Sequence, residues 1–308
     1  MMNKHVFLDN FTATIGTMIS GKLKFFSESI ESVSFKDHIK SIEISIPEIN
    51  MEGTYETAAR TSAGKLDPAF RVEKWLGDDY PTIIYHHGNN ERPFDYRKSA
   101  KNTFLNIFVK AHDKFRCNLI VVRSPFHNGS LKAYQMKVTR LDNFMAMLSA
   151  STVMNECIIK EIRRKSPAPV LTCGISLGGW ITNLHRSFFN SSTAYIPLMA
   201  GTFLGELFLE SKYRRLTSDL ALLNPEKIRQ LLNFNTLFDK VTDKNIYPVL
   251  ALYDQFIVFN TQNNSYGEHP VKSIEAGHVT GALSAGYFRK HILRTLRIMQ
   301  EQEESVKL

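Results

Sequence analysis

The stretch Gly174-Ile175-Ser176-Leu177-Gly178-Gly179 decides the fold of this chain. The apolar run Pro169 to Cys173 precedes it, and the helical pattern Trp180 to Phe189 follows it. A serine with glycines two residues away on either side, between a strand and a helix, is typical of a very tight turn with strained serine backbone angles. Such a turn lifts the hydroxyl clear of the sheet at the N-terminus of the helix. Ser176 is therefore the predicted nucleophile.

An acid and a histidine follow this serine in an order that supports the interpretation. The short apolar run Tyr247 to Tyr253 reads as a buried strand, and Asp254 stands at its C-terminal end. The run Val271 to Ala276 reads as a last strand, and His278 follows it after one glycine. Serine, acid and histidine in this order are typical of a triad built on a strand, turn and helix scaffold.

With these motifs the chain resembles the α/β-hydrolase family from about Ser41 to Gln302. A further match is the strand-like run Thr82 to Tyr85, because His86-His87-Gly88-Asn89-Asn90 follows it as the family's His-Gly oxyanion loop follows its third strand. The resemblance implies an α/β fold with a mostly parallel central sheet of about eight strands flanked by helices. It also implies hydrolysis through an acyl-enzyme. The loop lacks the three-glycine run of many lipases, and no proline follows Gly88 at the usual distance.

The chemistry assigns a role to each triad residue. A serine hydroxyl is a poor nucleophile at neutral pH and needs a base to remove its proton, which is the predicted role of His278. Asp254 would accept a hydrogen bond from the other ring nitrogen and fix the tautomer.

The oxyanion needs backbone N–H donors aimed at it. We predict them from Leu177, which follows the nucleophile, and from Asn89 in the loop. The predicted substrate-binding residues are His87, Gly88 and His127. A surface-loop histidine is an equal alternative for His127.

Each assignment has a structural alternative. Ser176 would otherwise be a turn serine that caps the following helix, and Asp254 would cap a later one. Glu206 and Glu275 are rival acids, the first within a helical stretch and the second within a strand. His278 would otherwise be an ordinary loop histidine.

Composition indicates a globular chain with a sizeable core. It has 308 residues, of which 43% are hydrophobic and 22% are charged, and a formal net charge of +8. The basic clusters lie in or beside helical patterns, so they indicate solvated helix faces, and we predict no nucleic-acid partner.

The cysteines and the N-terminus indicate a cytoplasmic protein. Three dispersed cysteines are too few for a disulfide framework and suggest a reducing compartment. We find no signal peptide and no apolar stretch of the roughly 18 residues that a membrane span requires. No cluster at ligand spacing surrounds His86 and His87, so we expect no metal, and no cofactor is implied.

The periodicities predict one continuous hydrolase domain, 41–308, after an N-terminal extension, 1–40, with a helical cap at about 200–245. We predict an antiparallel edge strand of the sheet at Lys40 to Pro47. The other predicted strands are Phe70 to Leu76, Asn118 to Arg123 and Thr193 to Met199, and the predicted helices are Ser99 to Phe115, Lys137 to Lys165 and His291 to Gln302.

The sequence thus predicts a serine hydrolase that cleaves an ester or related acyl bond of a small molecule through Ser176, His278 and Asp254. The alternatives are a thioesterase or a peptidase with the same triad, and a non-catalytic ligand-binding protein of the same fold. The oligomeric state cannot be predicted from the sequence.

Overall fold

A computed structural model describes residues 3–21, 23–98 and 100–306, without the side chains of residues 15–20 and 303–306. Its centre is an eight-stranded sheet in the order β11-β10-β9-β8-β6-β7-β5-β2. The six strands from β11 to β7 are parallel to one another, β5 is antiparallel to β7, and β2 is antiparallel to β5. The predicted α/β class and mostly parallel sheet are confirmed. The strands are β2 (Gly53–Glu56), β5 (Ala69–Lys74), β6 (Thr82–His86), β7 (Asn118–Arg123), β8 (Val170–Ile175), β9 (Ala194–Leu198), β10 (Val249–Ala251) and β11 (Lys272–Ile274).

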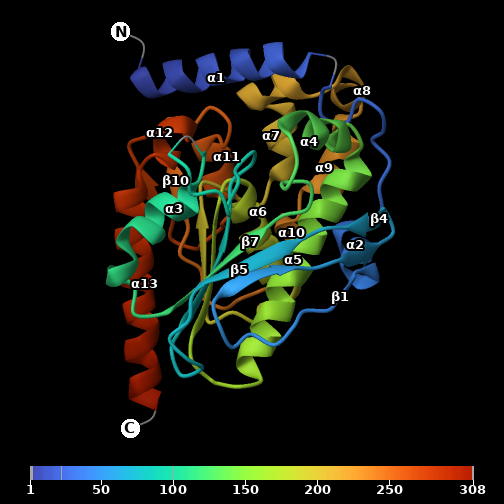
Figure 1. Cartoon of the computed structure of the whole chain (residues 1–308). Helices are drawn as coiled ribbons and strands as arrows, with labels where there is room; N and C mark the ends of the chain where they lie inside the picture. The colour runs from blue at the N-terminus through green and yellow to red at the C-terminus, as the bar shows by residue number, and fades with distance from the viewer. Residues whose placement is uncertain (1–2, 22, 99, 307–308) are drawn as a thin grey trace.

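Helices cover both faces of this sheet, so its central strands are buried on both sides (Figure 1). On one face, α3 (Thr103–Ile107) and α13 (Ala285–Val306) pack against apolar side chains such as Tyr85. On the other face, α5 (Leu141–Arg163) packs against residues such as Ile84. Adjacent residues of β6 therefore serve opposite cores, which explains why this strand reads as a continuous apolar run.

The predicted edge strand at Lys40 to Pro47 is shorter than expected and belongs to another sheet. Ser34 caps helix α2 (Phe35–Ser41), which takes up the first residues of that run. The strand that follows, β1 (Glu43–Ile44), pairs with β3 (Ala59–Thr61) in a separate sheet whose third strand is β4 (Gly64–Leu66). The alternating isoleucines pack against α5 and its neighbours. The alternation of apolar and polar residues therefore predicted correctly which side chains are buried, but it did not predict which strand pairs with this one.

Two predicted helices are each divided in the structure, the first by contacts that are distant in sequence. The predicted helix 137–165 is divided into α4 (Leu131–Val138) and α5, because Thr139 accepts a hydrogen bond from Glu28 N–H and the Leu141 N–H donates to Ser29, each at 2.9 Å. The predicted helix 99–115 is α3 followed by the 3₁₀ helix η1 (Val109–Lys114), with a kink at Ala111.

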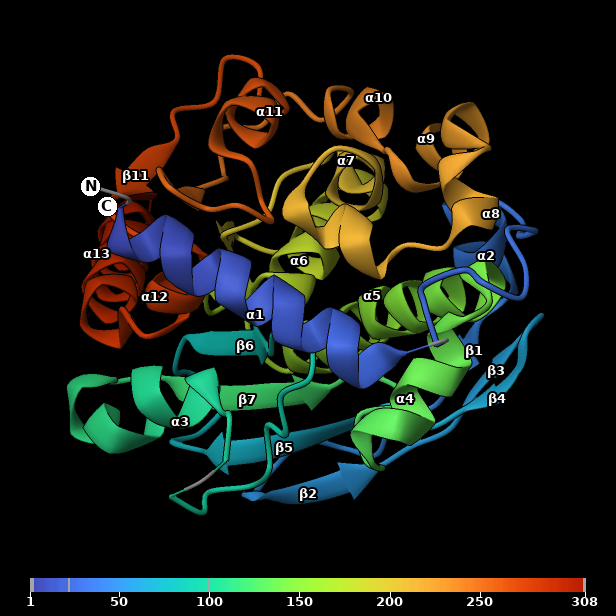
Figure 2. The same ribbon diagram turned by 90° about the horizontal axis from the view of Figure 1, so that it is seen from above.

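Between β9 and β10 the chain forms only short helices. Seen from above, they lie beside α6 (Leu177–Phe188) and near α11 (Phe259–Asn264) (Figure 2). They are α7 (Leu204–Leu209), η2 (Lys212–Leu216), α8 (Asp219–Leu222), α9 (Pro225–Leu232) and α10 (Asn235–Phe238).

The N-terminal segment, for which we predicted no element, forms helix α1 (Lys4–Ser20). Figures 1 and 2 show α1 lying across the top of the molecule, over the side on which α6 and α12 (His278–Ala282) begin. It packs against α12 near its own start and against η2 further along. Helix α1 therefore covers the edge of the sheet at which the parallel strands end.

Candidate active site

The turn between β8 and α6 has the strained geometry that the sequence predicted. Ser176 has φ 52° and ψ −111°, an unusual conformation for a residue with a side chain. A Cβ on Gly174 would overlap the carbonyl of Gly178, and a Cβ on Gly178 would overlap the carbonyl of His86. Both clashes are with backbone, which cannot rotate away, so both positions require glycine.

The structure brings Ser176, His278 and Asp254 together from three separate segments. Ser176 Oγ lies 3.2 Å from His278 Nε2, and His278 Nδ1 lies 2.8 Å from Asp254 Oδ2. The second carboxylate oxygen of Asp254 accepts hydrogen bonds from the N–H groups of Phe256 and Ile257, at 2.8 Å each. Asp254 therefore orients the imidazole and closes the turn that follows β10.

The two rival acids are placed elsewhere. Glu206 lies on α7 and forms an ion pair with Arg229 at 2.9 Å. Glu275 is exposed at the end of β11. The geometry favours Asp254 as the partner of His278.

Negative charges around His278 favour its protonated form. Burial lowers the pKa of His278, but the adjacent Asp254 and the more distant carboxylates of Asp9 and Glu91 outweigh burial and raise it above the usual value. The side chain keeps 20% of its surface exposed. These charges stabilise the imidazolium form of His278.

The loop after β6 is held by buried side chains. His87 is fully buried, with Nδ1 2.7 Å from the carbonyl of Gly88, and its Nε2 accepts from Ser124 N–H at 3.1 Å. Burial, together with the neighbouring His127 and His86, lowers its pKa well below the usual value. The ring is thus a neutral brace for the loop, and both of its nitrogens are already used within the protein.

The two predicted oxyanion donors lie in suitable elements. Leu177 is the first residue of α6, where an N–H has no partner within its own helix. The side chain of Asn89 donates to the hydroxyl of Tyr213 at 3.1 Å, which ties the loop to η2. The oxyanion role of the backbone N–H groups of Leu177 and Asn89 stays a prediction.

His127 is buried, so the surface-loop alternative is wrong. Its Nδ1 lies 3.0 Å from the carbonyl of Pro125, and its ring packs edge-on against His87 at 4.6 Å. Burial lowers its pKa to about 4. Substrate contact by His127, His87 and Gly88 stays a prediction.

Glu91 is a buried carboxylate in this loop that we did not single out from the sequence. It accepts from the N–H of Thr103 at 2.9 Å and from its hydroxyl at 2.7 Å. A Cβ on Gly88 would come within 2.8 Å of Glu91 Oε1, so the close approach depends on that glycine. No periodicity signals this contact, because it joins a loop to a helix start.

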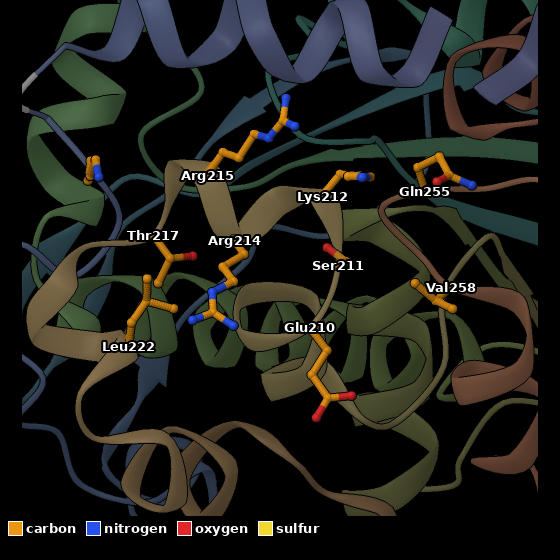
Figure 3. Close-up of a pocket in the computed structure, with 10 residues that line it drawn as sticks. Glu210, Ser211, Lys212, Arg214, Arg215, Thr217, Leu222, Gln255 and Val258 are labelled. Atoms are coloured by element: carbon orange, nitrogen blue, oxygen red, sulfur yellow. The ribbon is translucent and has the colours of Figure 1, made fainter. Parts of the chain in front are cut away.

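A cavity of about 490 Å³ lies beneath α1 and reaches Gln255, the residue after Asp254 (Figure 3). Arg215 extends toward α1, where it contacts Thr14, whereas Arg214 extends away from it (Figure 3). Among the described residues of the lining, the only carboxylate is Glu210, which is paired with Arg229 at 2.8 Å. The lining residues are Lys24, Glu210, Ser211, Lys212, Arg214, Arg215, Thr217, Leu222, Gln255 and Val258.

Two features are absent from the described part of the chain. Within residues 3–21, 23–98 and 100–306, no three histidine, cysteine, aspartate or glutamate side chains are grouped to hold a metal ion. Over the same residues, no helix is both long enough and apolar enough to span a bilayer.

Comparisons with known proteins identify the fold. No family model and no curated protein matches the chain. Among solved structures, it is similar to acetyl xylan esterase 1 from Thermoanaerobacterium sp. JW/SL YS485, with 14% identity and a TM-score of 0.50 over 83% of this chain and 90% of that one. It is also similar to Est1E from Butyrivibrio proteoclasticus, with 13% identity and a TM-score of 0.51 over 83% of this chain and 99% of that one.

A third similar structure is the acylaminoacyl peptidase from Pyrococcus horikoshii, with 14% identity and a TM-score of 0.51. The match covers 86% of this chain but only 42% of the peptidase. Together with the sheet order and the turn at Ser176, these likenesses show that the chain has the α/β-hydrolase fold.

Proposed function

We propose that this protein is a serine hydrolase that cleaves an ester or related acyl bond through an acyl-enzyme. The observation that carries the proposal is the continuous chain of contacts from Ser176 Oγ through His278 to Asp254. A ligand-binding role requires no such chain, so a catalytic role is the better explanation.

The reaction follows from these contacts. Ser176 Oγ attacks the acyl carbon while its proton passes to His278 Nε2, and the negative oxygen that forms is stabilised by the N–H groups of Leu177 and Asn89. The bond to the leaving group then breaks as His278 returns the proton to that group. Water, activated by the same imidazole, releases the acid and restores Ser176. No step needs a cofactor.

Labelling with a fluorophosphonate probe tests the proposal. We expect stoichiometric modification of Ser176, located by mass spectrometry of the labelled peptide. Only a serine whose hydroxyl is hydrogen-bonded to a general base attacks the phosphorus of the probe rapidly. Ser176→Ala should abolish labelling, and His278→Ala should slow it strongly. Folded wild-type protein that takes up no probe would refute the proposal and favour a binding role.

We further propose that the substrate carries an anionic group held in the cationic cavity. Lys24, Lys212 and Arg215 line it, and no ion pair is recorded for them among the described residues. The cavity reaches the turn that carries the predicted triad acid, because its lining residue Gln255 directly follows Asp254. Most of its lining comes from segment 200–245, which gives this predicted cap a role in substrate choice.

Matched substrates test this charge preference. We expect the mono-p-nitrophenyl ester of a dicarboxylic acid to have a kcat/KM at least tenfold higher than the neutral ester of equal length, with a difference that shrinks in salt. Lys212→Glu with Arg215→Glu should remove the preference. Lys290→Glu with Arg297→Glu on α13 makes the same change in net charge and should retain it. Equal rates for both esters in the wild type would refute the charge preference but not the hydrolase. Acyl-CoA thioesters supply phosphates instead of a carboxylate, so a still higher kcat/KM for them would identify a thioesterase.

All three cysteines are free thiols, which suits a reducing compartment. We therefore also propose a cytoplasmic location.

A further inference from the structure

One buried carboxylate on helix α1 contacts the backbone at both the acid and the base of the triad. Asp9 is fully buried. Its Oδ2 accepts from His278 N–H at 2.8 Å and from Gln255 N–H at 3.1 Å, and its Oδ1 accepts from Val279 N–H at 3.0 Å. These donors belong to the turn after β10 and to the start of α12, which follow different strands of the sheet.

Two of the three donors are at the start of a helix, where the backbone of that helix supplies no acceptor. They are the N–H groups of His278 and Val279, the first two residues of α12. Gln255 lies in the turn directly after Asp254. Asp9 therefore joins the residue that follows the triad acid to the residue that is the triad base.

Helix α1 fits closely against this region. A Cβ on Gly277 would lie 2.8 Å from Asp9 Oδ2 and 3.0 Å from the carbonyl of His5, so the close approach of α1 explains the glycine at this position. His5 Nδ1 lies 2.8 Å from Thr280 Oγ1, and the His5 ring stacks on Tyr253 at a centroid distance of 5.7 Å. The contacts of His5 with Thr280 and Tyr253 fix the start of α1, and with it the position of Asp9.

We propose that Asp9 is a positioning residue for catalysis: it fixes the loop after Asp254 and the start of α12 relative to each other, and so sets the geometry of the triad. This inference rests on the proposed hydrolase function. It makes α1 part of the active site rather than an appended segment. Asp9 does not contact the reacting atoms and acts through the backbone of His278 and Gln255.

The negative charge of Asp9 also affects the pKa of His278. The charged groups that face His278 are Asp254 from the turn after β10, Asp9 from α1 and Glu91 from the loop after β6, and each raises the pKa of His278 against the effect of burial. Removing the charge of Asp9 should lower this pKa. Because the base must be neutral to act, the acidic limb of kcat/KM should then move to lower pH.

Asp9→Asn is the decisive variant, because it keeps the size of the side chain but removes the charge and turns an N–H group toward backbone donors. We expect kcat for a p-nitrophenyl ester to fall about 10²-fold with little change in KM, as for a small displacement of reacting groups. The acidic limb of kcat/KM should shift to lower pH. Asp9→Glu retains the charge and should keep the limb in place while its kcat falls. Circular dichroism and the melting temperature verify that each variant is folded.

Two controls separate this role from general effects of mutation. Glu28→Gln removes an exposed charge from the N-terminal segment, and Thr12→Ala changes an exposed residue of α1. Both should leave kcat and the pH profile unchanged. Folded Asp9→Asn with wild-type kcat and pH profile would overturn the inference. A wild-type protein that neither reacts with the probe nor turns over esters would instead refute the proposed function, so the two failures are distinguishable.

Discussion

Ser176→Ala is expected to reduce kcat for any ester substrate by about 10⁶-fold, because the acyl-enzyme cannot form without its oxygen. Among the described residues, the Ser176 hydroxyl has one hydrogen-bond partner, His278. Removing the hydroxyl should therefore leave the core unchanged. KM should therefore change little. The measurement is steady-state turnover of a p-nitrophenyl ester, with the reaction followed long enough to detect such a low rate.

Two further variants sharpen this test. Ser187→Ala removes another serine hydroxyl, one that donates to the carbonyl of Asn183 within α6, and should keep full activity. Ser176→Gly should be as inactive as Ser176→Ala but more stable to heat, because glycine adopts a positive φ at little cost. Residual activity above about a hundredth of the wild type in Ser176→Ala would contradict the nucleophile assignment.

Asp254→Asn is expected to reduce kcat by about 10⁴-fold through the wrong tautomer of His278. The N–H groups of Phe256 and Ile257 both donate to one oxygen of the carboxylate, so they will select the amide oxygen of asparagine. Its NH₂ must then face His278 Nδ1, which has to accept. The ring proton moves to Nε2, which can no longer take the proton of Ser176.

Comparison with the rival carboxylate checks this prediction. Glu275→Gln, three residues before His278 and exposed, should leave kcat within twofold of the wild type. The NMR signals of the His278 ring should report the change of tautomer in Asp254→Asn. If that variant keeps more than a tenth of the wild-type kcat, then Asp254 does not orient the base.

The sequence predicted the centre of the fold well because its signals there are local. Strands β6, β7 and β8 are mostly apolar runs, each followed by a polar residue, and β7 begins and ends at the predicted residues, Asn118 and Arg123. The turn between β8 and α6 was predicted equally well, since Gly174 and Gly178 are required by backbone contacts within a few residues and with the adjacent β6.

The errors lie where a distant segment decides the local structure. The helical pattern from Lys137 is broken at Thr139 and Arg140 because Glu28 and Ser29 bond to the backbone there. The isoleucine alternation after Lys40 describes burial correctly, yet period two carries no information on which strand pairs with it.

The chain order of strands, glycines, serine, acid and histidine was sufficient to predict the fold and to select three residues that the structure brings together, because each is marked by its immediate neighbours. Only the tertiary structure revealed that Asp9, 269 residues before His278, accepts hydrogen bonds from the backbone of His278 and of Gln255, the residue after Asp254. A carboxylate that accepts from backbone N–H groups leaves no signature at the donor positions, since every residue other than proline has the same N–H. Its partners are chosen by the packing of α1 across the end of the sheet, which no local pattern encodes.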